Sequence, residues 1–227
     1  GHQIVVPYLN DQSAFQPSFI QKRTSQWWTR PRKYSVVYYF GSSNKRMRNS
    51  ARVYRQQFLE EVRSNWTLSP YVGDLPYVVQ TLEKDNAPSS EFFTEMYSGS
   101  VFCPTLPGDA PSQKRFFDVI LVGCLPVVLS FDTEMPSVSK KSWHSPNGFP
   151  IEDSYPWIKG SSSIQQEHEI DYESFVVQVE GGVENVKPVL ETLLKNSTEI
   201  ERRQVLMMKY ASYFSYGMGT DSHVYED

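Results

Sequence analysis

The chain has 227 residues, enough to bury the core of one large domain. Its formal net charge of −4 at pH 7 excludes the basic field typical of nucleic-acid-binding proteins, and its two cysteines are too few for a disulfide scaffold. No apolar run reaches the roughly 18 residues of a membrane span, and no signal peptide is visible.

The N-terminal segment, residues 1–33, holds a short apolar strand at 4–8 followed by a long polar loop. We interpret this segment as separate from the main domain. The main domain is predicted over residues 34–216, and a polar tail follows at 217–227.

A strand rich in β-branched and aromatic residues opens the main domain at 34–40. A basic loop and a helix over about residues 51–62 follow it. A strand, a basic loop and a helix N-terminus together predict an anion-binding corner, because main-chain N–H groups converge there. The candidate ligands are Arg46, whose place Arg48 could also fill, and Arg52. The alternative is a solvated basic face.

The most informative segment is 98–130, which reads as strand, polar Gly/Pro loop, amphipathic helix and second apolar strand. This order predicts a βαβ unit, whose loop and helix N-terminus form a natural site for a phosphate or diphosphate. Arg115 and Asp118 are three residues apart and therefore share one face of this helix. A cation beside a carboxylate suits a ligand with a phosphate at one end and a hydroxylated ring at the other, and a nucleotide sugar is such a ligand. An ordinary buried βαβ unit is the alternative. The candidate donor-binding residues of this unit are Pro107, Gly108, Asp109, Ser112, Arg115 and Asp118.

Past the second strand, Glu134 falls at the carboxyl edge, where α/β sheets bind their ligands. Residues 137–169 are rich in Ser, Pro and Trp and predict an insertion that leaves the same edge. Because loops of this length are usually functional, we interpret it as a flap at the ligand-binding edge. Helical periodicity returns over 183–194 and 199–214.

Two further patterns concern single residues. Cys103 ends one predicted strand and Cys124 begins the next, so they could lie close together, but free buried thiols are the state we expect. Two N-glycosylation sequons begin at Asn65 and Asn196, and such short motifs decide nothing by themselves. Asn196 also offers an N-cap to the last helix.

The order of these residues resembles the core signature of the exostosin-like family of inverting glycosyltransferases. The resemblance covers residues 4–216 and implies an α/β fold: the Rossmann-like nucleotide-sugar-binding lobe of a two-lobed GT-B glycosyltransferase, with the first lobe largely absent. Residues 1–33 would then be a link to, or a remnant of, that first lobe, which binds the acceptor. Asp at position 118, rather than Glu, favours plant-like, alga-like or algal-virus branches of the family. The matching residues are Ser100, Phe102, Cys103, Pro107, Gly108, Asp109, Ser112, Arg115, Phe117, Asp118, Gly123, Cys124, Pro126, Val127 and Ser130.

The resemblance implies an enzyme that transfers a sugar from a UDP-sugar to a glycan or glycoprotein acceptor with inversion. Because Asp118 favours the plant-like and alga-like branches, we choose a pentose such as xylose as the donor sugar. The arginines and loop amides would hold the departing diphosphate, Asp118 would bind the ribose hydroxyls, and Glu134 would be the catalytic carboxylate that faces the donor sugar. The general base is not assigned. The alternative is a non-catalytic module that binds a nucleotide sugar or carbohydrate, and the intact Glu134 and arginine corners favour the enzyme.

No metal or other cofactor is expected, because no Asp-x-Asp pair is present and cationic side chains can replace a metal at the diphosphate. His168 between Glu167 and Glu169 has the composition of a metal site, but adjacent side chains point apart, so we interpret an exposed loop. The lack of a nucleophile or metal motif also argues against a phosphate hydrolase. The compartment stays open between the Golgi lumen, for a eukaryotic enzyme, and the host cytoplasm, for a virus-encoded one.

Overall fold

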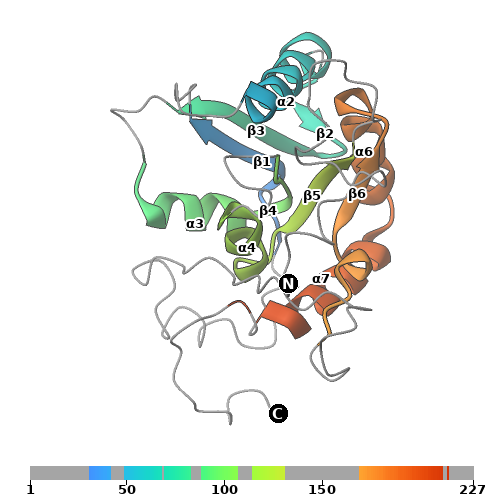
Figure 1. Cartoon of the computed structure of the whole chain (residues 1–227). Helices are drawn as coiled ribbons and strands as arrows, with labels where there is room; N and C mark the ends of the chain where they lie inside the picture. The colour runs from blue at the N-terminus through green and yellow to red at the C-terminus, as the bar shows by residue number, and fades with distance from the viewer. Residues whose placement is uncertain are drawn as a thin grey trace, which may run out of the picture.

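The computed structural model of the chain describes residues 31–41, 49–67, 69–82, 88–106, 114–130, 169–211 and 214. Within them, six strands form one sheet in the order β2-β3-β1-β4-β5-β6 (Figure 1). β2 runs antiparallel to β3, and every other neighbouring pair is parallel. The strands are β1 (Tyr34–Gly41), β2 (Tyr71–Val72), β3 (Leu75–Leu82), β4 (Ser100–Pro104), β5 (Leu125–Ser130) and β6 (Val177–Glu180).

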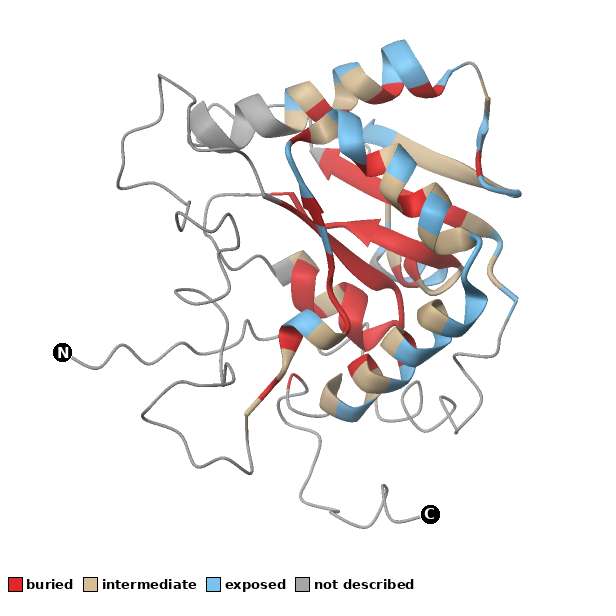
Figure 2. Cartoon of the chain, turned by 90° about the vertical axis from the view of Figure 1, so that its right-hand side faces the viewer, coloured by how far each residue is buried: buried red, intermediate tan, exposed pale blue. Residues whose placement is uncertain are grey.

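Helices cover both faces of this sheet, as expected where parallel strands are joined by helical crossovers. Figure 2 shows the buried strands at the centre, surrounded by helices that carry both buried and exposed residues. A π-helical turn (Val62–Trp66) extends the first helix, and 3-10 turns lie at Tyr172–Ser174 and Val183–Asn185. The α-helices are α2 (Asn49–Glu61), α3 (Ser90–Ser98), α4 (Lys114–Leu121), α6 (Val186–Leu194) and α7 (Ser197–Ala211).

The alternation of side chains along β1 divides the core into two layers. Val36, Tyr38 and Phe40 belong to an apolar cluster with residues of α2, α6 and α7. Val37 and Tyr39 belong to a second cluster with residues of α3, and α4 contributes to both. Because both faces are covered, β1 reads as a nearly continuous apolar run, which is typical of parallel strands.

The turn between α4 and β5 shows how the Gly-Cys-Leu-Pro sequence ends the helix. Gly123 adopts a left-handed conformation with a φ of 79°. Its N–H donates to the carbonyl of Ile120, and the N–H of Cys124 donates to the carbonyl of Val119, each at 3.0 Å. These are the two hydrogen bonds of a Schellman motif, and Cys124 and Val119 also share an apolar cluster. The motif turns the chain directly from α4 into β5.

Cys103 and Cys124 form a disulfide, so the expectation of free thiols is wrong. Cys103 lies in β4, in register with Pro126 of the neighbouring β5. The Schellman turn delivers Cys124 to the start of β5, where the Cα atoms of the two cysteines are 5.8 Å apart, a separation that a disulfide spans. The sequence pattern could not decide this, because it does not set the register between two strands.

The predicted Rossmann-like α/β fold is confirmed. The strand predicted at 34–40 is β1, and the βαβ unit predicted at 98–130 is formed by β4, α4 and β5. The domain limits stay predictions, because residues 1–30, nearly all of the insertion at 137–169 and the tail at 217–227 lie outside the described residues. In the part of the chain that the structure describes, no helix has the length and apolar composition needed to cross a bilayer.

Candidate functional site

The parallel strands β1, β4, β5 and β6 end at one edge of the sheet, the edge at which open α/β sheets bind their ligands. Val36 of β1 is level with Phe102 of β4. Continuing that register, Tyr38 reaches the level at which β4 ends, at Pro104. Helix α4 begins beyond this end of β4. The end of β1 and the first turn of α4 therefore meet at this edge.

The chain leaving β4 is held against β5 at its first residue. The N–H and the hydroxyl of Thr105 both donate to the carbonyl of Val127, at 2.8 and 3.2 Å, and Leu106 is fully buried. These contacts set where the predicted diphosphate loop starts. Four predicted ligands on that loop lie outside the described residues: Pro107, Gly108, Asp109 and Ser112.

Arg115, in the first turn of α4, places its guanidinium over the ring of Tyr38, with Cζ 5.0 Å from the ring centroid. This is the geometry of a cation–π contact. Nη1 of Arg115 is buried and has no hydrogen-bond partner among the described residues. A buried donor without an acceptor costs about 1–3 kcal/mol, and more when it is charged. The chain therefore holds a cation at this edge with one N–H donor that its described residues leave unmet.

The surroundings of Arg115 keep it charged. Burial works against the charge, but electrostatic interactions with Tyr97, Tyr38 and Asp118 outweigh it, so the pKa of Arg115 stands above its usual value. Burial also raises the pKa of Tyr97, so its hydroxyl stays protonated at neutral pH, and Asp118 is then the neighbour whose charge favours the guanidinium. Asp118 lies three residues after Arg115 on the same helix. The structure thus brings together the arginine and the carboxylate that the sequence paired, and their roles toward a ligand stay predictions.

The second predicted anion-binding corner is described only in part. β1 and α2 are the strand and the helix that were predicted to form it, and Arg52 lies in the first turn of α2. The side chain of Arg52 lies outside the described residues, as do the whole of Arg46 and Glu134. Their assignments to the diphosphate and to the donor sugar therefore stay predictions.

Tyr38 is the residue at this edge that the sequence analysis missed. Its side chain is fully buried and also packs on the rings of Phe40 and Phe58, at centroid separations of 5.1 and 5.6 Å. The alternation of residues 36, 38 and 40 identifies the face of the strand that packs in the core. It does not show whether an aromatic ring on that face also contacts a cation. The register between β1 and β4 was the missing information.

No cluster of three or more His, Cys, Asp or Glu side chains suited to a metal ion occurs among the residues that the structure describes. Glu167 and His168 of the charged triplet lie outside that part of the chain. The prediction that the diphosphate is bound without a metal therefore remains open to experiment.

The sheet order, the helical crossovers and the charged guanidinium at the carboxyl edge define a Rossmann-like α/β protein with a cation where such proteins bind ligands. Residues 1–193 match the Exostosin GT47 domain. The chain therefore belongs to the exostosin GT47 family, as its core motif predicted.

Two similar proteins come from Arabidopsis thaliana. One is the "Xyloglucan-specific galacturonosyltransferase 1", 39% identical over 57 residues, which is 25% of this chain and 8% of that protein. Another is the "Probable xyloglucan galactosyltransferase GT13", 49% identical over 39 residues, which is 17% of this chain and 8% of that protein. The matched segments thus span only a small part of each relative. Both are plant proteins, in line with the branch that Asp118 favours.

Proposed function

We propose that this chain contributes the nucleotide-sugar-binding lobe of a GT-B glycosyltransferase, which moves a sugar from a UDP-sugar to a glycan or glycoprotein acceptor with inversion. The observation that carries the proposal is the charged Arg115, whose buried Nη1 has no acceptor among the described residues, in the first turn of a helix at the carboxyl edge. Membership of the exostosin GT47 family supports the reaction class.

The chemistry explains why such a cation is needed. In an inverting transfer, the acceptor oxygen bonds to the anomeric carbon while the bond from that carbon to the diphosphate oxygen breaks. Negative charge grows on the departing UDP, so cations held at the diphosphate lower the barrier. Arg115 and the N-terminus of α4 would meet this charge, with the loop at 107–112 and with Arg46 and Arg52 completing the site.

Two carboxylates would orient the rest of the donor. Asp118 would accept hydrogen bonds from the ribose hydroxyls, as acidic residues do in dinucleotide sites. Glu134 would face the donor sugar and strengthen its contact as positive charge develops at the anomeric carbon, which favours the transition state over the bound substrate. The acceptor proton would pass to a base that lies outside the assigned residues.

The donor sugar and the acceptor form the finer part of the proposal. UDP-xylose is the donor that we put forward first, on the branch preference. The names of the two plant relatives instead mention galacturonosyl and galactosyl transfer specific to, or acting on, xyloglucan. UDP-galactose and UDP-galacturonate are therefore the competing donors, and xyloglucan is the first acceptor to test.

A donor screen tests this function. The chain is mixed with UDP and with each of the three UDP-sugars, and thermal stabilisation is measured first, because a ligand that binds only the folded state raises Tm. Release of UDP with and without xyloglucan is then measured on the chain and on the full gene product. We expect stabilisation by UDP and transfer from one donor. Stabilisation without transfer in the full gene product would favour a non-catalytic binding module, and no response to any uridine nucleotide would contradict the proposal.

The metal requirement is tested in the same assay. We expect stabilisation by UDP to persist in EDTA, because cationic side chains and main-chain N–H groups would take the place of a metal at the diphosphate. A strict dependence on Mn²⁺ would show that the site lacks the charge assigned to it.

A further inference from the structure

The disulfide between Cys103 and Cys124 indicates where this chain folds. Both cysteines are fully buried and belong to one apolar cluster, so the bridge is part of the core. Disulfides of this structural kind form and persist in oxidising compartments such as the lumen of the endoplasmic reticulum. In that lumen, Asn-x-Ser/Thr sequences become acceptors for N-linked glycans. The two sequons of the chain can therefore be compared by the surroundings of their asparagines.

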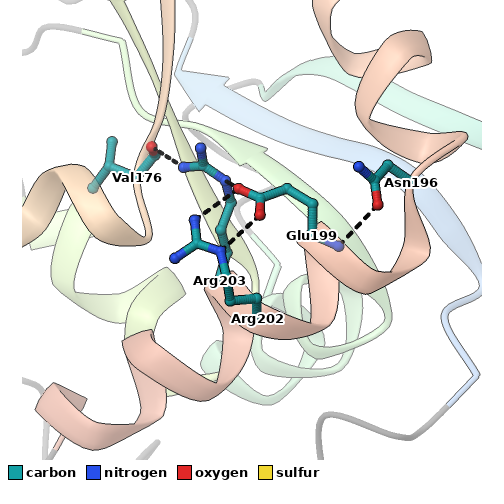
Figure 3. A network of polar contacts seen from close by, with 5 residues as sticks. All are labelled: Val176, Asn196, Glu199, Arg202 and Arg203. Atoms are coloured by element: carbon teal, nitrogen blue, oxygen red, sulfur yellow. Dashed lines mark hydrogen bonds and ion pairs between the residues drawn. The ribbon is translucent and has the colours of Figure 1, made fainter.

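Asn196 is exposed, and within the described residues its amide nitrogen is free of hydrogen bonds. It precedes α7, and its Oδ1 accepts a hydrogen bond from the N–H of Glu199 at 3.1 Å, so the oxygen caps the helix (Figure 3). Its Nδ2 donates no hydrogen bond to the described residues. Asn196, Ser197 and Thr198 are all exposed. A glycan on Nδ2 would leave the capping bond of Oδ1 in place.

Asn65 is exposed as well, but its amide nitrogen already has a partner. It lies inside the π-helical turn that follows α2, and its Nδ2 donates to Oε2 of Glu61 at 2.7 Å. The next residue, Trp66, is fully buried and is among the largest side chains of the core. A glycan on this nitrogen would disturb its hydrogen bond to Glu61. It would also have to fit on a helical surface beside Trp66, whose side chain packs in the core.

Asn196 also lies at the edge of the sheet opposite to the candidate donor site. Leu194, at the end of α6, packs so closely on Gly73 that an added Cβ there would lie 2.9 Å from its Cδ1, and Gly73 stands just before β3. Nη1 of Arg203 in α7 donates to the carbonyl of Val176, just before β6, at 2.7 Å. Both contacts mark the amino ends of parallel strands. A glycan on Asn196 would therefore leave the carboxyl edge open.

We propose that Asn196 carries an N-linked glycan and is the principal glycosylation site of this chain. The donor is an oligosaccharide linked through a diphosphate to a polyprenol lipid, and a membrane-bound oligosaccharyltransferase of the host cell catalyses the transfer. Nδ2 forms a bond to the anomeric carbon as the bond from that carbon to the diphosphate oxygen breaks. Nδ2 loses one proton, and the lipid diphosphate leaves.

The test uses the 227-residue chain behind a secretory leader in a eukaryotic cell. The whole lumenal pool is treated with a peptide amidase in ¹⁸O-water, which marks each formerly glycosylated asparagine as an ¹⁸O-aspartate, and peptides covering both sequons are quantified by mass spectrometry. We expect the label at Asn196 in most chains, and far less at Asn65. Unlabelled Asn196 in chains that contain the Cys103–Cys124 disulfide, or a label mainly at Asn65, would overturn the proposal.

Matched variants separate the modification from the helix cap. Asn196→Asp retains a capping oxygen and Thr198→Ala retains Asn196 itself, and each should abolish the gel shift caused by the glycan. Thr198→Ser keeps the sequon and should keep the shift, as should Asn65→Asp. A shift that survives Thr198→Ala would contradict the assignment. None of these readouts depends on sugar transfer by the chain, so they are independent of the proposed function.

Discussion

At the amino edge of the sheet, arginine side chains donate to acceptors that the chain itself supplies. Arg32 donates to the carbonyl of Ser98, before β4, and to that of Gly123, before β5, the latter at 3.0 Å. Arg203 donates to the carbonyl of Val176, before β6, as Figure 3 shows. These cations tie the starts of three parallel strands to neighbouring elements, and their charge is used within the fold.

At the carboxyl edge, Arg115 lies over an aromatic ring and leaves a buried N–H donor unmet by the described residues. Nε of Arg32 is also buried without a hydrogen-bond partner among the described residues, so an unmet donor alone does not separate the two edges. The difference is that both terminal nitrogens of Arg32 meet main-chain carbonyls, whereas Nη1 of Arg115 meets no described acceptor and its guanidinium lies over a ring. The comparison teaches that the same residue type stabilises one edge and, on our account, serves a ligand at the other. The predictions below run from the largest expected effect to the smallest.

Glu134→Gln should separate chemistry from binding at the carboxyl edge. We expect sugar transfer by the full gene product to fall by two or more orders of magnitude, in the range of about 10²–10⁴ found when a catalytic acid or base is lost. UDP itself should bind as well as before, because the side chain is assigned to the sugar. Kinetics of transfer and calorimetry with UDP measure the two effects. Near-normal transfer would make Glu134 a structural residue.

Replacing both cysteines tests how much the disulfide between β4 and β5 stabilises the fold. The disulfide joins residues separated by 21 positions, and a loop of that size corresponds to about 3 kcal/mol of stabilisation through the unfolded state. We expect the Cys103→Ser, Cys124→Ser double variant to lose roughly that amount in urea unfolding. The reduced wild-type chain is the matched control and should unfold like the variant. Equal stability of the oxidised chain and the variant would show that the disulfide does not stabilise the fold.

Arg203→Ala and Arg115→Ala should change stability by different amounts. Removing Arg203 takes a charged donor from the Val176 carbonyl and from Glu199, and we expect a loss of about 1–2 kcal/mol. Removing Arg115 loses a buried cation–π contact of about 2 kcal/mol but also removes an unmet buried donor, which costs about 1–3 kcal/mol, so the net change should be smaller. Urea unfolding of both variants measures this. A larger loss for Arg115→Ala would break the comparison.

The smallest effect concerns acid stability at the amino edge. Hydrogen bonding to Arg202, with Arg203 also close by, lowers the pKa of Glu199 from 4.5 to about 2. Because the folded pKa is below the unfolded one, the stabilisation is present above about pH 4.5 and is lost as the pH falls toward 2. The difference in unfolding free energy between wild type and Glu199→Gln should therefore shrink over that range. A difference that stays constant from pH 5 to pH 2 would contradict the shift.

Local patterns predicted much of the fold. The β-branched run of β1 and the Gly/Pro loop ahead of an amphipathic helix identified the strands and the crossover at 98–130, and Asn196 caps α7 as expected. These features depend on a few neighbouring residues, so a sequence can reveal them. The state of the two cysteines was misread, because it depends on how β4 and β5 align.

The candidate site was predictable to a smaller extent. The pairing of Arg115 with Asp118 follows from helical spacing, and the structure has it. The ring of Tyr38 beneath Arg115 comes from a strand far earlier in the chain. Only the register of β1 against β4 places it there. Contacts between distant segments depend on packing, which no local pattern encodes.

The most direct test of the central claim is calorimetry of UDP binding to the wild-type chain and to Arg115→Ala. We expect affinity to fall at least about tenfold, because a hydrogen bond to a charged group contributes about 1.5–3 kcal/mol. Arg115→Lys should lie between the two, since it keeps the charge but loses the planar fork. Arg202→Ala, at the amino edge, is the matched control and should bind UDP as wild type does. Unchanged UDP affinity in Arg115→Ala would contradict the account.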